Sequence, residues 1–383
     1  MVTSLSRPPG IGSRLTTMGD GARIGLGALA AVYAAINLAA TTAGVRLATS
    51  DDVDILRELN DAGLSSSNLL LDLSIGRFFA PWKFRFLSRV LALDSAWMVI
   101  GLRTIWVLMP AAACAWFAAV ALKSRDAGCL VGLLLAATHP VSVGYQPLLS
   151  NPQLLVGLTL VLIACVCVLN VARGRWPCWA NSAALFLYAT ALIMQENFVV
   201  FLAVIVWAKL AFRQNPASWK DQIGFIAPYL FVTAAYVSIY GLLRAYAAAL
   251  GMSYEGAQLR FDLFAFCNAL VRYTLSAFPG FGCVSNLLSS PSHDPFAIWP
   301  HLETWLRTNL RWQDLTGGLL SGAAVAGLAH RLKQLSPFRL GRFASAATFA
   351  LVFSPNLLIA LTPKYQVWAL QRRYPYYYPI ARS

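Results

Sequence analysis

Long apolar runs, interrupted by few charges, are the feature of this sequence that most constrains its fold. Of its 383 residues, 58% are hydrophobic and only 12% are charged, about half the charged share of an average soluble domain. Runs of about 18 or more apolar residues recur, which is long enough for a helix to cross a hydrocarbon layer about 30 Å thick. The sequence therefore predicts an all-α fold, a polytopic transmembrane helical bundle.

The apolar runs predict about nine spans within a single module that covers residues 1–383. The first run has no recognisable cleavage site after it and is longer than a signal-peptide core, so it is expected to be a helix of the protein. The third run is short and is expected to break at "THPVS". The expected helices are 24–44, 104–122, 127–143, 153–172, 179–194, 197–212, 222–243, 315–332 and 344–362.

Basic residues are distributed unevenly between the two ends of these helices. With the N-terminus inside, the inside segments carry 14 basic and 3 acidic residues, out of 30 and 16 in the chain. This bias follows the positive-inside rule and predicts a cytoplasmic N-terminus. We expect the protein to be integral to a membrane, the inner membrane of a bacterial cell. The basic residues counted inside are Arg7, Arg14, Arg23, Lys123, Arg125, Arg173, Arg175, Lys209, Arg213, Lys220, Arg331, Lys333, Arg339 and Arg342.

Two long segments, 45–103 and 244–314, then fall outside the membrane. Both mix apolar and charged residues, and "NLLLDLSIGRFFAPWKFRFLSRVLAL" has the basic and aromatic content of helices that lie along a membrane surface. Extracytoplasmic interfacial helices are therefore expected within these loops. Arg103 is expected to cap the outer end of the second span by snorkelling toward water.

Several function classes are excluded by what the sequence contains. The net charge of +14 is explained by basic cytoplasmic loops, so no nucleic-acid partner is predicted. The seven cysteines show no metal-binding spacing. The sequence has no Gly-rich phosphate loop, no His-Glu-x-x-His helix and no Gly-x-Ser-x-Gly elbow, which argues against a nucleotide-fuelled pump or a membrane hydrolase of those types.

Charged side chains converge on the outer face. They include Asp51 and Asp52 after the first span, Glu196 at a turn between two spans, and the C-terminal "QRRYPYYYPIARS". Ionisable groups at the margins of an apolar bundle often mark a site. A carboxylate can act as a base toward a hydroxyl, and paired arginines can hold a phosphate. This combination suits transfer of a group from a lipid-linked phosphate to an acceptor.

The order of several short motifs resembles the GT-C superfamily of integral membrane glycosyltransferases, with protein O-mannosyltransferases and related bacterial enzymes as the nearest likeness. The motifs are the acidic pair after the first helix, "GRFF-P", "HPVS", "NP-LLVGL", "MQENFVVFLAVIVWAKL" and "RRYPYYYPI". They cover nearly the whole chain. The resemblance implies inverting transfer of a sugar from a polyprenyl-phosphate-linked donor to a protein, glycan or lipid acceptor at the extracytoplasmic face.

The resemblance also implies roles for individual residues. Asp51 or Asp52 is the expected catalytic base, and Glu196 is expected to orient the acceptor or a metal. Gln195 stands where the family has a lysine, which weakens a phosphate role at that turn. A divalent cation is compatible with these carboxylates but is not required. The remaining expected residues are Arg372, Arg373 and Tyr374 on the donor phosphate, with His139 and Arg77 lining the pocket. For His139, beside Pro140, a helix-breaking packing role is an equal alternative.

Two other functions remain open from the sequence. A transporter or flippase of a lipid-linked intermediate would also present charges in a membrane, although such folds often show internal repeats and this chain shows none. An inactive scaffold subunit is the other alternative.

Overall fold

The computed structural model describes residues 18–42, 95–143, 152–211, 219–251, 262–276 and 312–334, together with positions 73, 78, 79, 86, 89, 360, 361, 363, 366 and 367. Almost all of these residues are helical, and this part of the chain contains no β-strand. The all-α prediction is therefore confirmed.

Every predicted span except 344–362 has a helical counterpart, and that last span lies outside the described residues apart from 360 and 361. A 3₁₀ helix, η1 (Glu196–Val200), precedes α9, and α11 (Leu263–Ser276) lies between α10 and α14. The α-helices at the predicted spans are α1 (Asp20–Thr42), α5 (Ala96–Ala121), α6 (Arg125–Val143), α7 (Pro152–Ala172), α8 (Trp179–Met194), α9 (Phe201–Ala211), α10 (Trp219–Ala249) and α14 (Trp312–Gln334).

Three of the described helices are long and apolar enough to cross a membrane, and they indicate a membrane protein. They are Ala96–Ala121, Gln153–Ala172 and Ile223–Ala249, which lie in α5, α7 and α10. Trp179–Met194 and Thr316–Leu328 are apolar but shorter. The predicted total of about nine spans is not confirmed, although the positions of the described helices agree with it.

The structure departs from the predicted boundaries at α5 and α6. Helix α5 begins at Ala96, eight residues before the expected start, with the Ser95 hydroxyl accepting a hydrogen bond from the Met98 N–H. The expected break at "THPVS" is wrong, because α6 continues through Pro140 to Val143. A proline removes one backbone donor, but helices packed in a bundle tolerate that loss. Two other helices also contain prolines, Pro110 in α5 and Pro228 in α10.

Helix α11 lies within the expected outer segment 244–314. The Asp262 carboxylate caps its first turn by accepting a hydrogen bond from the Ala265 N–H, 3.0 Å away. Leu263 and Phe264 remain exposed, as is typical of a helix that meets a membrane surface. The interfacial helices expected between 68 and 93 fall almost wholly outside the described residues.

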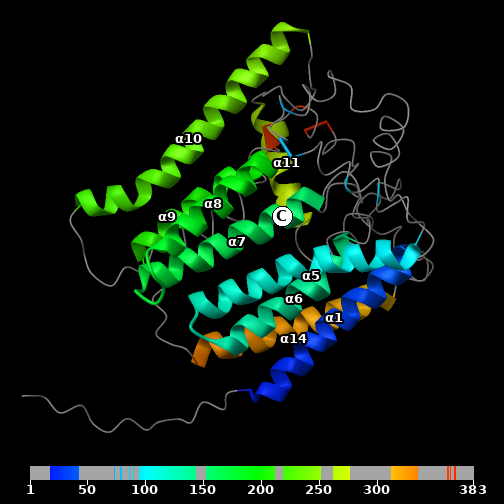
Figure 1. Cartoon of the computed structure of the whole chain (residues 1–383). Coiled ribbons are helices and arrows are strands. Elements are labelled where there is room, and N and C mark those ends of the chain that lie inside the picture. The colour runs from blue at the N-terminus through cyan, green and yellow to red at the C-terminus, as the bar shows by residue number, and fades with distance from the viewer. Residues whose placement is uncertain are drawn as a thin grey trace, which may run out of the picture.

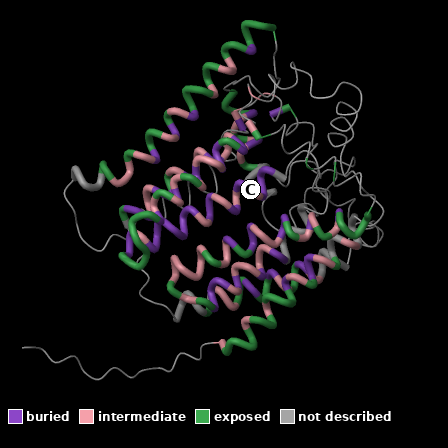
Figure 2. The backbone as a smooth tube through the Cα atoms, viewed as in Figure 1, coloured by how far each residue is buried: buried purple, intermediate pink, exposed green. Residues whose placement is uncertain are grey.

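The helices pack side by side in an order that differs from their order in the sequence (Figure 1). Helix α10 contacts α8 and α9, both of which contact α7. Helix α7 also contacts α5, α5 contacts α6, and α6 in turn packs against α1 and α14. Helix α7 is central: 67% of its apolar span is buried, against 17% for α10 at the periphery (Figure 2).

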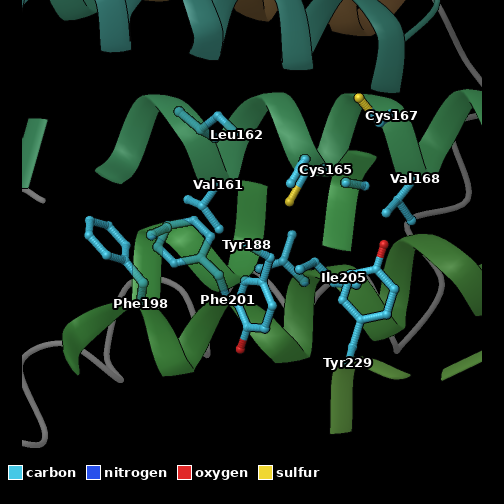
Figure 3. Close-up of a cluster of buried hydrophobic side chains, with 14 of the residues drawn as sticks. Val161, Leu162, Cys165, Cys167, Val168, Tyr188, Phe198, Phe201, Ile205 and Tyr229 are labelled. Atoms are coloured by element: carbon cyan, nitrogen blue, oxygen red, sulfur yellow. The ribbon is translucent and has the colours of Figure 1, made fainter. Parts of the chain in front are cut away.

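The core around α7 is apolar but includes three tyrosines, Tyr188, Tyr229 and Tyr236. Val161, Cys165 and Val168 of α7 face the bulky side chains of α8, η1, α9 and α10 (Figure 3). The Tyr188 and Thr233 hydroxyls lie 3.0 Å apart and hydrogen-bond. The polar ends of buried tyrosines usually need such partners. The other large members of this core are Phe198, Phe201 and Ile205.

Small residues allow α5 and α6 to approach closely. Gly128 and Gly132 stand four residues apart on α6, the spacing of the small-xxx-small motif that brings membrane helices together. A Cβ added at Gly128 would lie 2.6 Å from both the carbonyl oxygen of Ala115 and the Cβ of Ala119. The two backbones are therefore as close as glycine permits.

Gly128→Ala is expected to lower the unfolding temperature of the detergent-solubilised protein, because the added methyl group overpacks the α5–α6 contact. Overpacking costs about 1–3 kcal/mol, whereas the gain in helix propensity is about 1 kcal/mol. Gly25→Ala in α1 is the matched control, because nothing lies within 4 Å of its added Cβ. Equal unfolding temperatures for the two variants would contradict the close packing.

Candidate functional site

One end of the bundle is called here the basic end. It contains the starts of α1, α6 and α10 and the ends of α5, α7 and α9. The Arg23 Nε lies 3.0 Å from an Asp126 carboxylate oxygen. The Arg173 guanidinium donates to the carbonyls of Val120 and Ala121, and the Lys209 ammonium donates to the carbonyl of Phe225. Segments predicted to share the cytoplasmic side therefore lie at one end. Which side of a membrane this end faces stays a prediction.

The opposite end, called the far end, contains the turn between α8 and α9. Gln195 interrupts the helix with an extended backbone, φ −160° and ψ 137°, and Glu196 begins η1. Gln195 is buried and Glu196 is half-buried. The prediction that Glu196 lies at a turn between two helices is confirmed.

If α8 enters a membrane from the basic end, its length would place this turn within the bilayer rather than beyond it. Helix α8 has 16 residues and so spans about 24 Å, less than the ~30 Å of a hydrocarbon layer. Trp176 and Trp179, at its start, are exposed, and tryptophans in such positions anchor helices at the membrane–water interface. Counted from that anchor, Glu196 is reached before the opposite interface.

Close packing against α7 fixes the position of the turn. Phe198 of η1 is almost fully buried and covers Gly157 of α7, where an added Cβ would lie 2.2 Å from the Phe198 ring. The Phe198 ring also packs against Phe201, with centroids 6.0 Å apart. Glycine at position 157 therefore lets η1 rest directly on the central helix.

Three side chains form a row along one face of α10. Tyr236, Tyr240 and Arg244 stand four residues apart and share one helix face. Tyr236 is buried and is close enough to Glu196 for the two side chains to interact electrostatically. The Tyr236 and Tyr240 rings stack with centroids 6.2 Å apart and planes 8° apart, and Arg244 donates to the Tyr240 hydroxyl.

The first expected outer segment also reaches this place. The Phe78 ring meets the Tyr236 ring edge-on, with centroids 6.1 Å apart and planes 75° apart. Phe78 belongs to the "GRFF" motif and is otherwise far from α10 in sequence. Phe78 and Tyr236, from distant parts of the chain, are therefore in ring contact, and Tyr236 lies within electrostatic range of Glu196.

The other predicted site residues are not placed. Asp51, Asp52, Arg77, Arg372, Arg373 and Tyr374 lie outside the described residues. His139 belongs to the described backbone of α6, toward the far end, but its side chain is outside the description. The predicted meeting of these residues with Glu196 stays a prediction. Within the described part of the chain no three His, Cys, Asp or Glu side chains gather as a metal site would require.

The prediction for Arg103 is wrong. Its side chain is 1% exposed, so it does not snorkel to water. Because α5 starts earlier than expected, Arg103 lies two turns inside the helix, among residues that pack against neighbouring helices. A buried arginine in an apolar bundle marks a functional candidate, and Arg103 lies in the half of α5 nearer the far end.

Three residues of the site were missed by the sequence analysis. Tyr236, Tyr240 and Arg244 fall in or just beyond a predicted span, where tyrosines resemble an interfacial belt. Their spacing of four in "YVSIYGLLR" was the signal available, because it aligns two aromatic rings with a cation on one helix face.

No protein-family model, curated protein or solved structure matches this chain. The family resemblance of the sequence therefore remains a prediction, and function has to be inferred from the residues and their geometry.

Gly157→Ala is expected to displace Phe198 and destabilise the turn, because the added methyl group meets a fully packed ring. We expect a loss of about 1–3 kcal/mol, measured as a lower unfolding temperature in detergent. Gly224→Ala on α10 adds a methyl group with nothing within 4 Å and should leave that temperature unchanged or higher. The described packing would be wrong if the Gly157 variant were as stable as the Gly224 variant.

Proposed function

We propose that this protein transfers a sugar from a polyprenyl-phosphate-linked donor to a hydroxyl of a protein, glycan or lipid acceptor, with inversion at the anomeric carbon. One observation carries the proposal. Away from the basic end, Phe78 of the first outer segment packs against Tyr236 of α10, and Tyr236 lies within electrostatic range of Glu196 at the α8–α9 turn. The turn and the outer segment are parts of the chain on which the resemblance to GT-C enzymes rests.

In the proposed reaction the acceptor oxygen attacks the anomeric carbon as its proton passes to Asp51 or Asp52. The bond between that carbon and the phosphate oxygen breaks, and polyprenyl phosphate leaves with the electron pair. Arg372 and Arg373 stabilise the phosphate, with Tyr374 beside them. Glu196 orients the acceptor, directly or through a divalent cation.

The position of Glu196 supports a substrate that remains in the membrane. A carboxylate at this depth is costly unless it serves a function, and a lipid-linked sugar presents its polar head close to the bilayer. Helix α10, alongside the turn, leaves Phe231, Val237 and Leu242 exposed, an apolar surface suited to an isoprenoid chain. Buried Arg103 adds positive charge toward the same end. The proposed location is the inner membrane of a bacterial cell, with the basic end in the cytoplasm.

Glu196→Gln is expected to reduce sugar transfer from a radiolabelled polyprenyl-phosphate mannose in nanodiscs about 10²-fold, since a misplaced substrate loses a factor of this order. The matched control, Asp20→Asn, removes an 83% exposed carboxylate at the basic end, where an exposed ion pair contributes only about 0–1 kcal/mol. Equal transfer rates in the two variants would remove Glu196 from the mechanism.

Asp51→Asn and Asp52→Asn are expected to differ sharply, because only one carboxylate serves as the base and a positioned base contributes about 10²–10⁴-fold. The measurement is sugar transfer by each single variant and by the double variant. Full activity of the double variant would refute the mechanism. Movement of the intact lipid-linked sugar to the opposite leaflet, without transfer, would instead indicate a transporter.

A further inference from the structure

Two buried polar atoms, one at the α8–α9 turn and one on α10, have no hydrogen-bond partner within the described part of the chain. They are the Tyr236 hydroxyl oxygen and the Gln195 amide oxygen, Oε1. Both residues are more than nine-tenths buried, with 7% and 6% of their surface exposed. Leaving a buried polar group without a partner costs about 1–3 kcal/mol, so such atoms call for an explanation.

Other tyrosines in the same core show what an ordinary structural role requires. The Tyr188 hydroxyl bonds to Thr233, and the Tyr229 hydroxyl donates to Asn181, whose side-chain oxygen is 3.1 Å away. Tyr229 lies on the same helix as Tyr236, seven residues earlier and nearer the basic end. The missing partner therefore distinguishes Tyr236 from Tyr229 on the same helix.

The surroundings hold the Tyr236 ring in place. Phe78 meets it edge-on and Tyr240 stacks on it, while Arg244 donates to Tyr240. A ring fixed between two aromatic neighbours presents its hydroxyl in a set direction. It can therefore bind a ligand with little further loss of conformational entropy.

The chemistry of the three groups selects a hydroxyl-rich ligand. Gln195 Oε1 only accepts hydrogen bonds, whereas the Tyr236 hydroxyl can donate one. A phosphate diester offers only acceptors and so leaves Gln195 Oε1 without a donor, and the Glu196 carboxylate would repel its negative charge. A sugar hydroxyl both donates and accepts, so neighbouring sugar hydroxyls can satisfy both atoms.

We propose that Gln195 and Tyr236 form a sugar-binding subsite beside Glu196, in which Tyr236 donates to one sugar oxygen and a neighbouring sugar hydroxyl donates to Gln195. This inference rests on the proposed function and adds to it the residues that recognise the sugar. The sugar belongs either to the lipid-linked donor or to a glycan acceptor, and the two sources share this chemistry.

The test compares Tyr236→Phe with Tyr229→Phe in the full-length protein in nanodiscs. Loss of one hydrogen bond should weaken binding of polyprenyl-phosphate mannose to the Tyr236 variant about 3- to 10-fold, with binding of polyprenyl phosphate unchanged. The Tyr229 variant should bind both lipids as the wild type does. Thermal unfolding should show the reverse order, with the Tyr229 variant destabilised and the Tyr236 variant as stable as the wild type or more so.

The outcomes separate this inference from the proposed function. If wild type binds the mannose lipid and Tyr236→Phe binds it equally well, saturation-transfer NMR with methyl mannoside tests the acceptor source. A signal weakened only in Tyr236→Phe supports an acceptor subsite, and an unchanged signal overturns the inference.

If wild type does not bind the mannose lipid, the proposed function loses its support. The NMR comparison with methyl mannoside then tests the subsite alone: a signal weakened only in Tyr236→Phe supports it, and an unchanged signal overturns it. A lower unfolding temperature for Tyr236→Phe would show that its hydroxyl bonds within the protein, and would also overturn the inference.

Discussion

The packing of neighbours around α7 is the interaction on which the rest of this bundle depends. Its residues carry no charge, and two of its buried polar side chains bond within the helix: Thr159 donates to the Leu155 carbonyl and Asn170 to that of Val166. A helix that satisfies its own polar groups can be surrounded by apolar neighbours without cost. Helices α5, α8 and α9 pack against α7, and α10 packs against α8 and α9.

Polar groups in the described helices divide between two tasks. At the basic end, Arg173 and Lys209 are almost fully buried but donate to main-chain carbonyls of adjoining helices. Lys209 also lies over the rings of Phe225 and Tyr229, 3.6 and 4.2 Å from their centroids. These groups join helices. At the far end, Gln195 and Tyr236 are similarly buried, but Gln195 Oε1 and the Tyr236 hydroxyl have no hydrogen-bond partner within the described chain, which is why that end is the better candidate for function.

The sequence predicted the helices well where length and apolar content decide the outcome. Helix α8 has the predicted bounds, and α7 begins one residue earlier than predicted, because charged or helix-breaking residues flank both apolar runs. The start of α5 and the continuation of α6 through Pro140 were mispredicted. Both depend on packing against neighbouring helices, which overrides local preference.

The candidate site was predictable only in part. Glu196 stood out because a carboxylate between two apolar runs has few structural explanations. Tyr236 did not, because a tyrosine in a span is ordinary until its neighbours are known, and Phe78 approaches it from more than 150 positions away in the sequence. Arg103 was expected to reach water because the sequence placed the start of this helix at residue 104. Helix α5 begins at Ala96, so Arg103 lies inside it. Long-range contacts and helix termini are the information that local patterns lack.

The shortness of α8 has a consequence for how any ligand would arrive. If α8 is anchored at one membrane interface by Trp176 and Trp179, its 16 residues end before the opposite interface, and a molecule that binds at the α8–α9 turn need not leave the lipid phase. Its encounter rate would be set by lateral diffusion in one leaflet. Occupancy would then follow the mole fraction of that molecule among the surrounding lipids, and its concentration in water would matter little.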